Sequence, residues 1–93
     1  MKINIEIEYL TSDMQMVNFH IRENDALSGQ DAVFFFKCLA DGLFKSGVDV
    51  ILANIKKMKS ARHIHLFVRQ CGMKPASENE QSIIYYLRRK GEV

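Results

Sequence analysis

Hydrophobic and polar residues alternate along two stretches near the start of the chain, residues 2–10 and 14–22. A period of two is the pattern of a β-strand with one buried face. We therefore predict a hairpin whose loop, around residues 11–13, has an odd number of residues. A loop of odd length sets the apolar residues of one strand opposite the apolar residues of the other. A turn of three or five residues is expected. The predicted register pairs Ile7 with Val17, Ile5 with Phe19 and Ile3 with Ile21.

One long amphipathic helix is predicted over residues 28–47, the segment around which the chain is organised. At about 100° per residue, one wide face holds the apolar side chains Ala32, Val33, Phe35, Phe36, Leu39, Ala40, Leu43 and Phe44. Ser28 and Asp31 form a capping box at its start, and Gly47 supplies a left-handed residue at its end.

Phe34 breaks the pattern of this helix, because it projects from the polar face with Cys38 one turn further along. One interpretation is that another segment of the chain covers the ring. The other is an exposed aromatic anchor for a partner, since such anchors supply much of the energy of protein interfaces.

Two readings are open for the segment after Gly47. Asp49 is a suitable cap for a second helix through about Lys59, in which Ile51, Ile55 and Met58 would share one face. The run Val48, Val50, Ile51 and Leu52 also suits a buried strand, and periodicity does not separate the two over so few turns.

Residues 62–69 alternate again and predict a third strand, with Phe67 and the histidines on its outward face. The alternative is a helix over residues 61–71, capped by Ser60 and ended by Gly72. Its buried face would hold Ala61, Ile64, Val68 and Cys71, and with the last helix it would resemble a helix-turn-helix.

A final helix is predicted from Ser77, which forms a capping box with Glu80, to about Lys90. Tyr85 would then lie on the polar face near Arg88 and Arg89, as a second aromatic residue among charges. Together these elements predict a single α+β domain over residues 1–93. Its order would be β-β-α-α-β-α, with a three-stranded antiparallel sheet and helices packed on one face.

Composition narrows the class of protein. The 47% hydrophobic and 26% charged residues are ordinary for a globular chain, and two isolated cysteines fit neither a disulfide scaffold nor a zinc motif. The charges at Glu6 and Glu8 interrupt any signal peptide, and no stretch approaches a membrane span. We therefore expect a cytoplasmic protein with free thiols and no membrane association.

Candidate chemistry is sparse. No catalytic or nucleotide-binding motif is present, so an enzyme is not expected, and no cofactor is implied. In the predicted sheet, His20, His63 and His65 would share one exposed face and could bind zinc. The same face carries Glu6 and Glu8, so cross-strand polar pairs are the favoured interpretation and no metal is predicted.

Charge is unevenly distributed. Residues 1–47 hold four Lys/Arg against seven Asp/Glu, a net charge of −3, whereas residues 48–93 hold nine against four, a net charge of +5. The basic half could contact phosphates, with an aromatic ring nearby for stacking. The candidate nucleic-acid residues are Lys56, Lys57, Lys59, Arg62, Phe67 and Lys90, and Arg88 and Arg89 would belong to the same basic surface if the fold places them beside it.

We expect a small, non-catalytic regulator or inhibitor that binds another protein, with an acidic surface on that partner. The candidate partner-binding residues are Phe34, Cys38, Tyr85, Arg88 and Arg89. The predicted hairpin also leaves a free sheet edge, through which two copies could pair as a homodimer. A nucleic-acid-binding protein that uses the basic C-terminal half is the alternative.

Overall fold

The structure, a computed structural model, describes residues 3–11, 13, 15–23 and 29–89. The elements in chain order are β1 (Ile3–Tyr9), β2 (Met16–Glu23), α1 (Gly29–Lys45), β3 (Val50–Lys56), the 3₁₀ turn η1 (Lys59–Ala61), α2 (Arg62–Gln70), β4 (Lys74–Glu78) and β5 (Ser82–Arg88).

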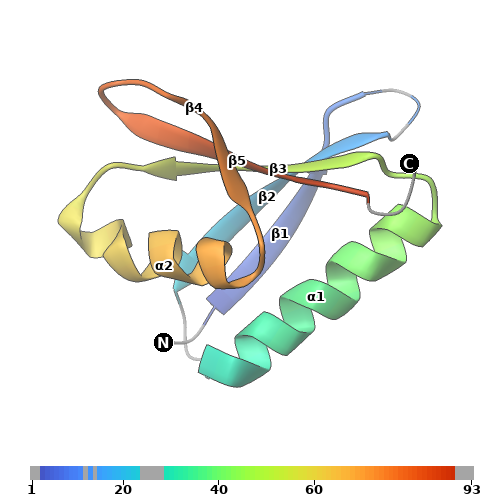
Figure 1. The fold of residues 1–93 in the computed structure, drawn as a ribbon, viewed down its shortest axis with the longest axis horizontal. Helices are drawn as coiled ribbons and strands as arrows, with labels where there is room; N and C mark the ends of the chain where they lie inside the picture. The colour runs from blue at the N-terminus through green and yellow to red at the C-terminus, as the bar shows by residue number, and fades with distance from the viewer. Residues whose placement is uncertain (1–2, 12, 14, 24–28, 90–93) are drawn as a thin grey trace.

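The described strands form one five-stranded mixed sheet in the order β1-β2-β3-β5-β4. Strands β2 and β3 are parallel and the other neighbours are antiparallel. Both helices lie on the same side of this sheet (Figure 1). The fold is therefore a small α+β structure, but the predicted three-stranded antiparallel sheet and the order β-β-α-α-β-α are wrong.

The hairpin of β1 and β2 forms as expected, with its register displaced by two residues. Ile7 pairs with Phe19 and Ile5 with Ile21, while Ile3 pairs with Glu23. The N–H of Leu10 donates to the carbonyl of Met16 at 2.9 Å, so the pairing continues to these two residues, and the expected turn includes positions outside the described residues. Because the displacement is an even number, the apolar residues stay on the core face.

Helix α1 confirms the long amphipathic helix. Gly47 has φ +115°, in the left-handed region, and the N–H of Val48 donates to the carbonyl of Leu43 at 3.0 Å, six residues apart counted inclusively. This is the Schellman arrangement that closes a helix. Val48 is buried just beyond it. The proposed cap, Ser28, lies outside the described residues.

The helix expected after Asp49 is wrong, and the alternative strand is right, because residues 50–56 form β3. Ile51, Ala53 and Ile55 are buried, which is a period of two. Ile51 and Ile55 are four residues apart, and residues at that spacing share a face in a helix and also in a strand, where every second residue faces the same way. Branched side chains and a place in the middle of the sheet favour the strand.

The strand expected over residues 62–69 is also wrong, and the alternative helix forms there, although Ser60 does not cap it, because Ser60 lies in η1 and α2 begins without a side-chain cap. These residues form α2, with Ala61, Val68 and Cys71 buried and Ile64 half-buried. Gly72 has φ +94°, and the N–H of Met73 donates to the carbonyl of Val68 at 3.0 Å, so α2 ends in the same way as α1. No helix-turn-helix follows, because the next described segment is a hairpin.

The final helix is replaced by the hairpin of β4 and β5. Asn79, between the two strands, accepts hydrogen bonds at its side-chain oxygen from the N–H groups of Gln81, at 2.7 Å, and Ser82, at 2.8 Å. An Asn side chain that binds the backbone two residues ahead stabilises a turn. That turn takes the place of the capping box expected from Ser77 and Glu80.

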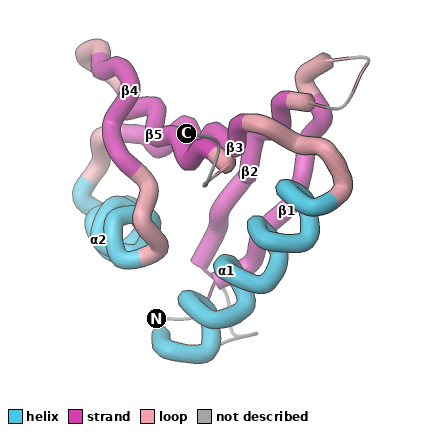
Figure 2. The backbone as a smooth tube through the Cα atoms, turned by 45° about the vertical axis from the view of Figure 1, so that its right-hand side comes forward, coloured by secondary structure: helices cyan, strands magenta, loops and turns pink. Residues whose placement is uncertain are grey.

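Three buried rings join the two layers of the fold. Phe19 of β2 and Phe36 of α1 meet edge to face at 5.3 Å between ring centroids, and Phe36 meets Phe67 of α2 at 5.9 Å. Such edge-to-face contacts stabilise beyond the burial of area alone. Phe36 therefore fixes α1 against β2 and α2 together, and toward the C-terminus of α1 the two helices diverge (Figure 2).

Candidate functional site

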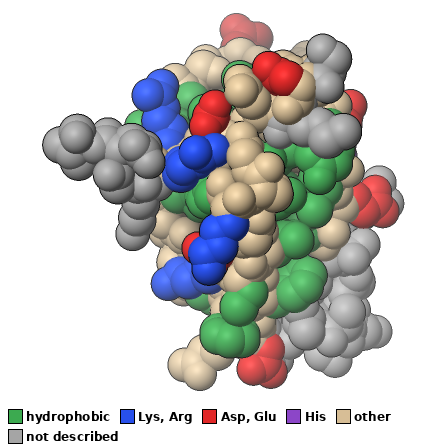
Figure 3. All heavy atoms as spheres, turned by 90° about the vertical axis from the view of Figure 1, so that its right-hand side faces the viewer, with side chains coloured by type: hydrophobic (Ala, Val, Ile, Leu, Met, Phe, Trp, Pro, Cys, Tyr) green, Lys and Arg blue, Asp and Glu red, His purple; other side chains and the backbone are tan. Residues whose placement is uncertain are grey.

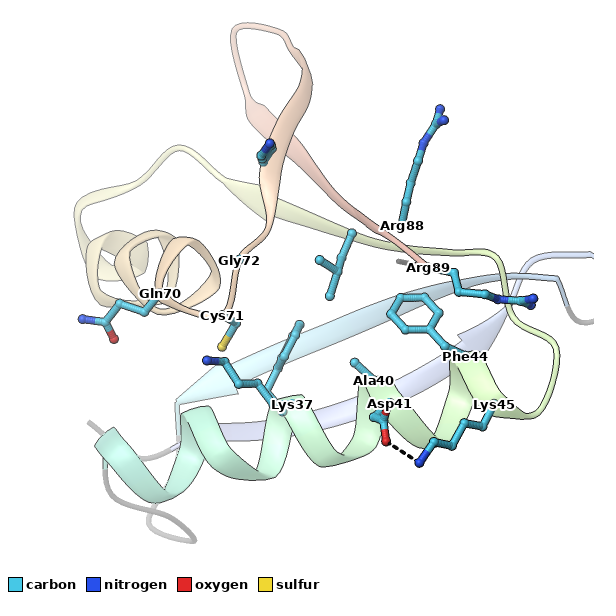
Figure 4. Close-up of a pocket in the computed structure, with 13 residues that line it drawn as sticks. Lys37, Ala40, Asp41, Phe44, Lys45, Gln70, Cys71, Gly72, Arg88 and Arg89 are labelled. Atoms are coloured by element: carbon cyan, nitrogen blue, oxygen red, sulfur yellow. Dashed lines mark ion pairs between the residues drawn. The ribbon is translucent and has the colours of Figure 1, made fainter. Parts of the chain in front are cut away.

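A cleft of about 980 Å³ opens between α1 and the segment that connects α2 to β4 (Figure 4). Its apolar lining comes from three elements: Phe36, Ala40 and Phe44 of α1, Cys71 and Gly72 after α2, and Leu87 of β5. Here the two helices leave part of the sheet uncovered, and β5 forms the far wall. The cleft is a concave site with an apolar lining, the usual character of a binding site.

The rim of the cleft is strongly basic. Five cations line it, namely Lys37, Lys45, Lys74, Arg88 and Arg89, against the single carboxylate Asp41. Lys45 pairs with Asp41 at 3.0 Å. Arg89 pairs with Asp49 at 2.9 Å and donates to the carbonyl of Val48 at 3.0 Å, which fixes its side chain.

Lys37 and Lys74 are exposed, and neither has an ion-pair partner within the described residues. Lys37 points across the cleft toward Cys71 in Figure 4. Arg88 points away from the cleft in the same view, and its guanidinium lies 5.9 Å from the ring centroid of Tyr86. Lys37 and Lys74 are therefore the cations with free hydrogen-bonding capacity for a ligand.

Cys71 is a buried thiol in the wall of this cleft. Burial raises its pKa to about 12 from an ordinary value of 9.0, although the charge of Lys37 opposes the shift. The neutral thiol is the form that an apolar wall favours, since desolvation penalises a thiolate. Cys71 therefore contributes to the lining as a small hydrophobic side chain.

Tyr85 is a correction to the predicted partner-binding residues. It lies in β5 and is 0% exposed, whereas the sequence analysis placed it on the polar face of a helix. Its hydroxyl is 2.9 Å from Nδ1 of His65, and the guanidinium of Arg69 lies 5.9 Å from its ring centroid. An aromatic ring buried in this way serves the core and is not available as an anchor.

Phe34 has the exposure expected of an anchor. Its side chain is 70% exposed on α1, and Cys38 one turn along is also exposed, so the interpretation in which another segment covers the ring fails for the described residues. Neither residue lines the cleft. The structure therefore does not bring Phe34 and Cys38 together with Arg88 and Arg89 in one site.

Part of the predicted nucleic-acid surface is gathered beside α2. A shallow groove of about 420 Å³, which we call the α2 patch, is lined by Lys57, Met58, Lys59, Arg62, His65, Leu66 and Arg69. Lys57 forms an ion pair with Glu78. Lys56 lies next to the patch on β3, and Lys90 lies outside the described residues. Phe67 is fully buried, so it offers no ring for stacking there.

The three histidines are separated. His20 lies on β2, where its Nε2 is 2.7 Å from Oε1 of Glu8, so it forms the cross-strand pair that was favoured over a metal site. His63 and His65 lie on α2, on which the predicted shared sheet face does not exist. Within the described ranges, no three His, Cys, Asp or Glu side chains are placed to hold a metal ion together.

Sequence reasoning missed the cleft because its free cations and its apolar lining are distant in the chain. The sequence analysis singled out neither Lys37 nor Lys74 as a candidate site residue. The two line one opening because the segment that follows α2, with Cys71 and Gly72, lies across the cleft from α1. The basic pair Arg88 and Arg89 was the one local signal for this region.

In the part of the chain that the structure describes, neither helix combines the length and the apolar character needed to cross a bilayer. Comparisons with protein-family models and with curated proteins found no match for this sequence.

Proposed function

We propose that this chain is a non-catalytic binding protein that holds an acidic, partly apolar segment of another protein in the cleft between α1 and β5. The observation that carries the proposal is the combination of an apolar lining with two free cations at its rim, Lys37 and Lys74. This combination fits a peptide that presents carboxylates beside an aliphatic or aromatic side chain.

The two parts of the cleft would contribute differently to binding. Burial of one leucine-sized side chain against Phe44 and Leu87 stabilises a complex by about 1.5–3 kcal/mol. Each exposed ion pair at Lys37 or Lys74 adds only about 0.2–1 kcal/mol, because water and salt screen it. The apolar lining would therefore supply most of the affinity, while the cations select acidic partners and speed their approach.

The side chains in the cleft support binding over catalysis. Cys71 is the thiol of the site, and its pKa of about 12 keeps it protonated near neutral pH. A protonated thiol is a poor nucleophile. The cations that are held in place, Lys45 and Arg89, are each already paired with a carboxylate. The cleft is thus suited to hold a ligand.

Fluorescence anisotropy with three labelled peptides tests the proposal. The first alternates glutamate and leucine, the second replaces each glutamate by glutamine, and the third replaces each leucine by serine. We expect the glutamate–leucine peptide to bind most tightly, in a manner that weakens as salt rises above about 0.15 M. Equal binding of all three peptides, or of none, would contradict the proposal.

Matched charge variants locate the binding site. Lys37→Glu with Lys74→Glu reverses the two free rim cations, and should weaken the glutamate–leucine peptide about tenfold. Lys59→Glu with Arg62→Glu makes the same change in net charge on the α2 patch. That control should bind the peptide nearly as tightly as the original chain, and a loss equal to that of the rim variant would move the site away from the cleft.

A second candidate function is nucleic-acid binding at the α2 patch, favoured by the gathering of Lys59, Arg62 and Arg69 around one shallow groove. Phosphate binding by such cations gives an affinity that falls linearly with salt on a log–log plot. With labelled single-stranded RNA as the probe, Lys59→Glu with Arg62→Glu should abolish binding and the rim variant should not. Binding only at very low salt would argue against this function.

A further inference from the structure

The outer edge of β1 is open in the described fold. β1 is the first strand in the sheet order and pairs only with β2, so one of its two edges carries backbone groups without a strand beside them. Its seven residues include neither proline nor glycine. An edge of this kind is a template for pairing with another chain.

The opposite edge of the sheet is protected. β4 carries Pro75, and its register with β5 shifts between Pro75 and Ser77. Proline removes a donor, and an irregular register bends the strand, so both features discourage pairing by a further strand. Only one of the two edges in the described sheet is therefore suited to strand addition.

Hydrogen bonding within the hairpin defines which residues of β1 face outward. The bond from Leu10 N–H to the Met16 carbonyl marks the even-numbered residues as those that bond to β2. Because the direction alternates along an antiparallel strand, the odd-numbered residues turn N–H and C=O toward the open edge. These outward groups belong to Ile3, Ile5, Ile7 and Tyr9.

Apolar side chains continue from this edge onto α1. Ile5 and Ile7 are half-buried, and Tyr9 is 51% exposed. Phe35 is 40% exposed and lies about 180° around the helix from Phe44, which faces the cleft, so Phe35 is on the other flank. On the face shown in Figure 3, Lys and Arg side chains gather toward the left, and hydrophobic side chains form a band beside them toward the right.

We infer that two copies of this chain pair through β1, antiparallel, to form a continuous ten-stranded sheet. The side chains on the outer face select the register of this pairing. A two-fold axis at Glu6 would set Glu6 opposite Glu6 of the second copy, and an axis at Ile7 would set Glu6 opposite Glu8. Both registers are unfavourable because they bring like charges together. An axis at Ile5 sets Glu6 opposite position 4 and Ile7 opposite position 3, so that no two glutamates of β1 face each other.

An axis at Ile5 also gives the outward backbone groups of β1 hydrogen-bond partners in the second copy. Ile5 is one of the residues with outward N–H and C=O groups, so Ile5 and its symmetry mate exchange both hydrogen bonds directly. Both copies of α1 then lie on the same face of the joined sheet, with the flanks that carry Phe35 directed toward each other. The pairing leaves the cleft open, since the cleft lies on the opposite flank of α1.

Sedimentation equilibrium over a concentration series tests this inference with charge variants of Asn4. Asn4→Lys places a lysine opposite Glu6 at two symmetric positions and should strengthen the dimer about tenfold. Asn4→Glu places glutamate opposite glutamate and should weaken it about tenfold. Ile7→Pro removes an outward N–H without removing a bond to β2, and should give a monomer.

The folded state of each variant is checked by circular dichroism and urea unfolding, and the two Asn4 variants keep the test valid if Ile7→Pro does not fold. A monomer at every concentration of the unmodified chain would overturn the inference. So would a dimer whose stability is the same with lysine, asparagine or glutamate at position 4.

Discussion

The ring of His65 connects α2 to the sheet through the hydroxyl of Tyr85. Nδ1 of His65 is 2.9 Å from the Tyr85 oxygen, and Nε2 is 2.9 Å from the carbonyl oxygen of Lys56. Because a carbonyl only accepts, Nε2 must carry the hydrogen and donate to it. In the neutral ring Nδ1 then accepts from the Tyr85 hydroxyl. One histidine thus joins α2 to both β3 and β5.

Substitutions at Tyr85 separate its ring from its hydroxyl. Tyr85→Phe removes one hydrogen bond and should lower the free energy of unfolding by about 1 kcal/mol. Tyr85→Ala leaves a cavity in the core and should cost about 3–5 kcal/mol. Urea unfolding measures both. If Tyr85→Ala folded with unchanged stability but bound a partner less tightly, the residue would be an anchor after all.

Phe34 and Phe36 form a matched pair on α1, because one is 70% exposed and the other 0%. Phe34→Ala should change the free energy of unfolding by no more than about 0.5 kcal/mol. Phe36→Ala removes the ring that meets both Phe19 and Phe67, and should cost about 3–5 kcal/mol. Thermal and urea unfolding of the two variants under one condition gives the comparison. A large loss for Phe34→Ala would mean that its ring is covered.

Replacing Gly42 or Gly47 by alanine should change the free energy of unfolding in opposite directions. Gly42 lies inside α1 with nothing within 4 Å of an added Cβ, so Gly42→Ala should raise the free energy of unfolding by about 0.5–1 kcal/mol. Gly47 has equal space but φ +115°, so Gly47→Ala should lower it by more than about 1 kcal/mol. Urea unfolding measures the free energy of unfolding of both variants. If both substitutions changed it in the same direction, the left-handed conformation at the end of α1 would be contradicted.

The two thiols should differ in reactivity. Cys38 is exposed and should react with a water-soluble maleimide in the folded protein at about pH 8. Cys71 is buried with its pKa raised to about 12, so it should react only after denaturation. Mass spectrometry counts the labels, and one label on the folded protein is expected. Rapid double labelling of the folded protein would show that Cys71 is accessible.

The raised pKa of Cys71 also gives stability a dependence on pH. The unfolded thiol ionises near 9.0 and the folded thiol near 12, so the unfolded state loses its proton first. This contribution is fully present below pH 9.0 and is lost as the pH rises toward about 12, by at most about 1.4 kcal/mol per pH unit. In urea unfolding, Cys71→Ala should reduce the fall in the free energy of unfolding above pH 9.0. If the fall were unchanged in this variant, other titrating groups would be its cause.

Local chemistry made α1 predictable, since its apolar face persists over 17 residues and Gly47 ends it. Shorter segments were ambiguous. Ile51 and Ile55 fit either period, and α2 has both an alternating pattern and a helical face. In β5 the run of Ile83, Ile84, Tyr85 and Tyr86 puts apolar side chains on both faces of the sheet, so it lacks the alternation that identifies a strand with one buried face. The cleft depends on contacts between distant segments, which periodicity does not contain.

The most direct test of the proposed function is amide chemical-shift mapping of the isotope-labelled protein during titration with the glutamate–leucine peptide. Binding in the cleft predicts the largest changes at Ala40, Phe44, Gly72 and Leu87, with little change along η1 and at Arg62. It also predicts that the glutamine–leucine peptide produces smaller changes at the same amides. Changes centred on the α2 patch, or no change at any amide, would contradict the assignment of the cleft as the binding site.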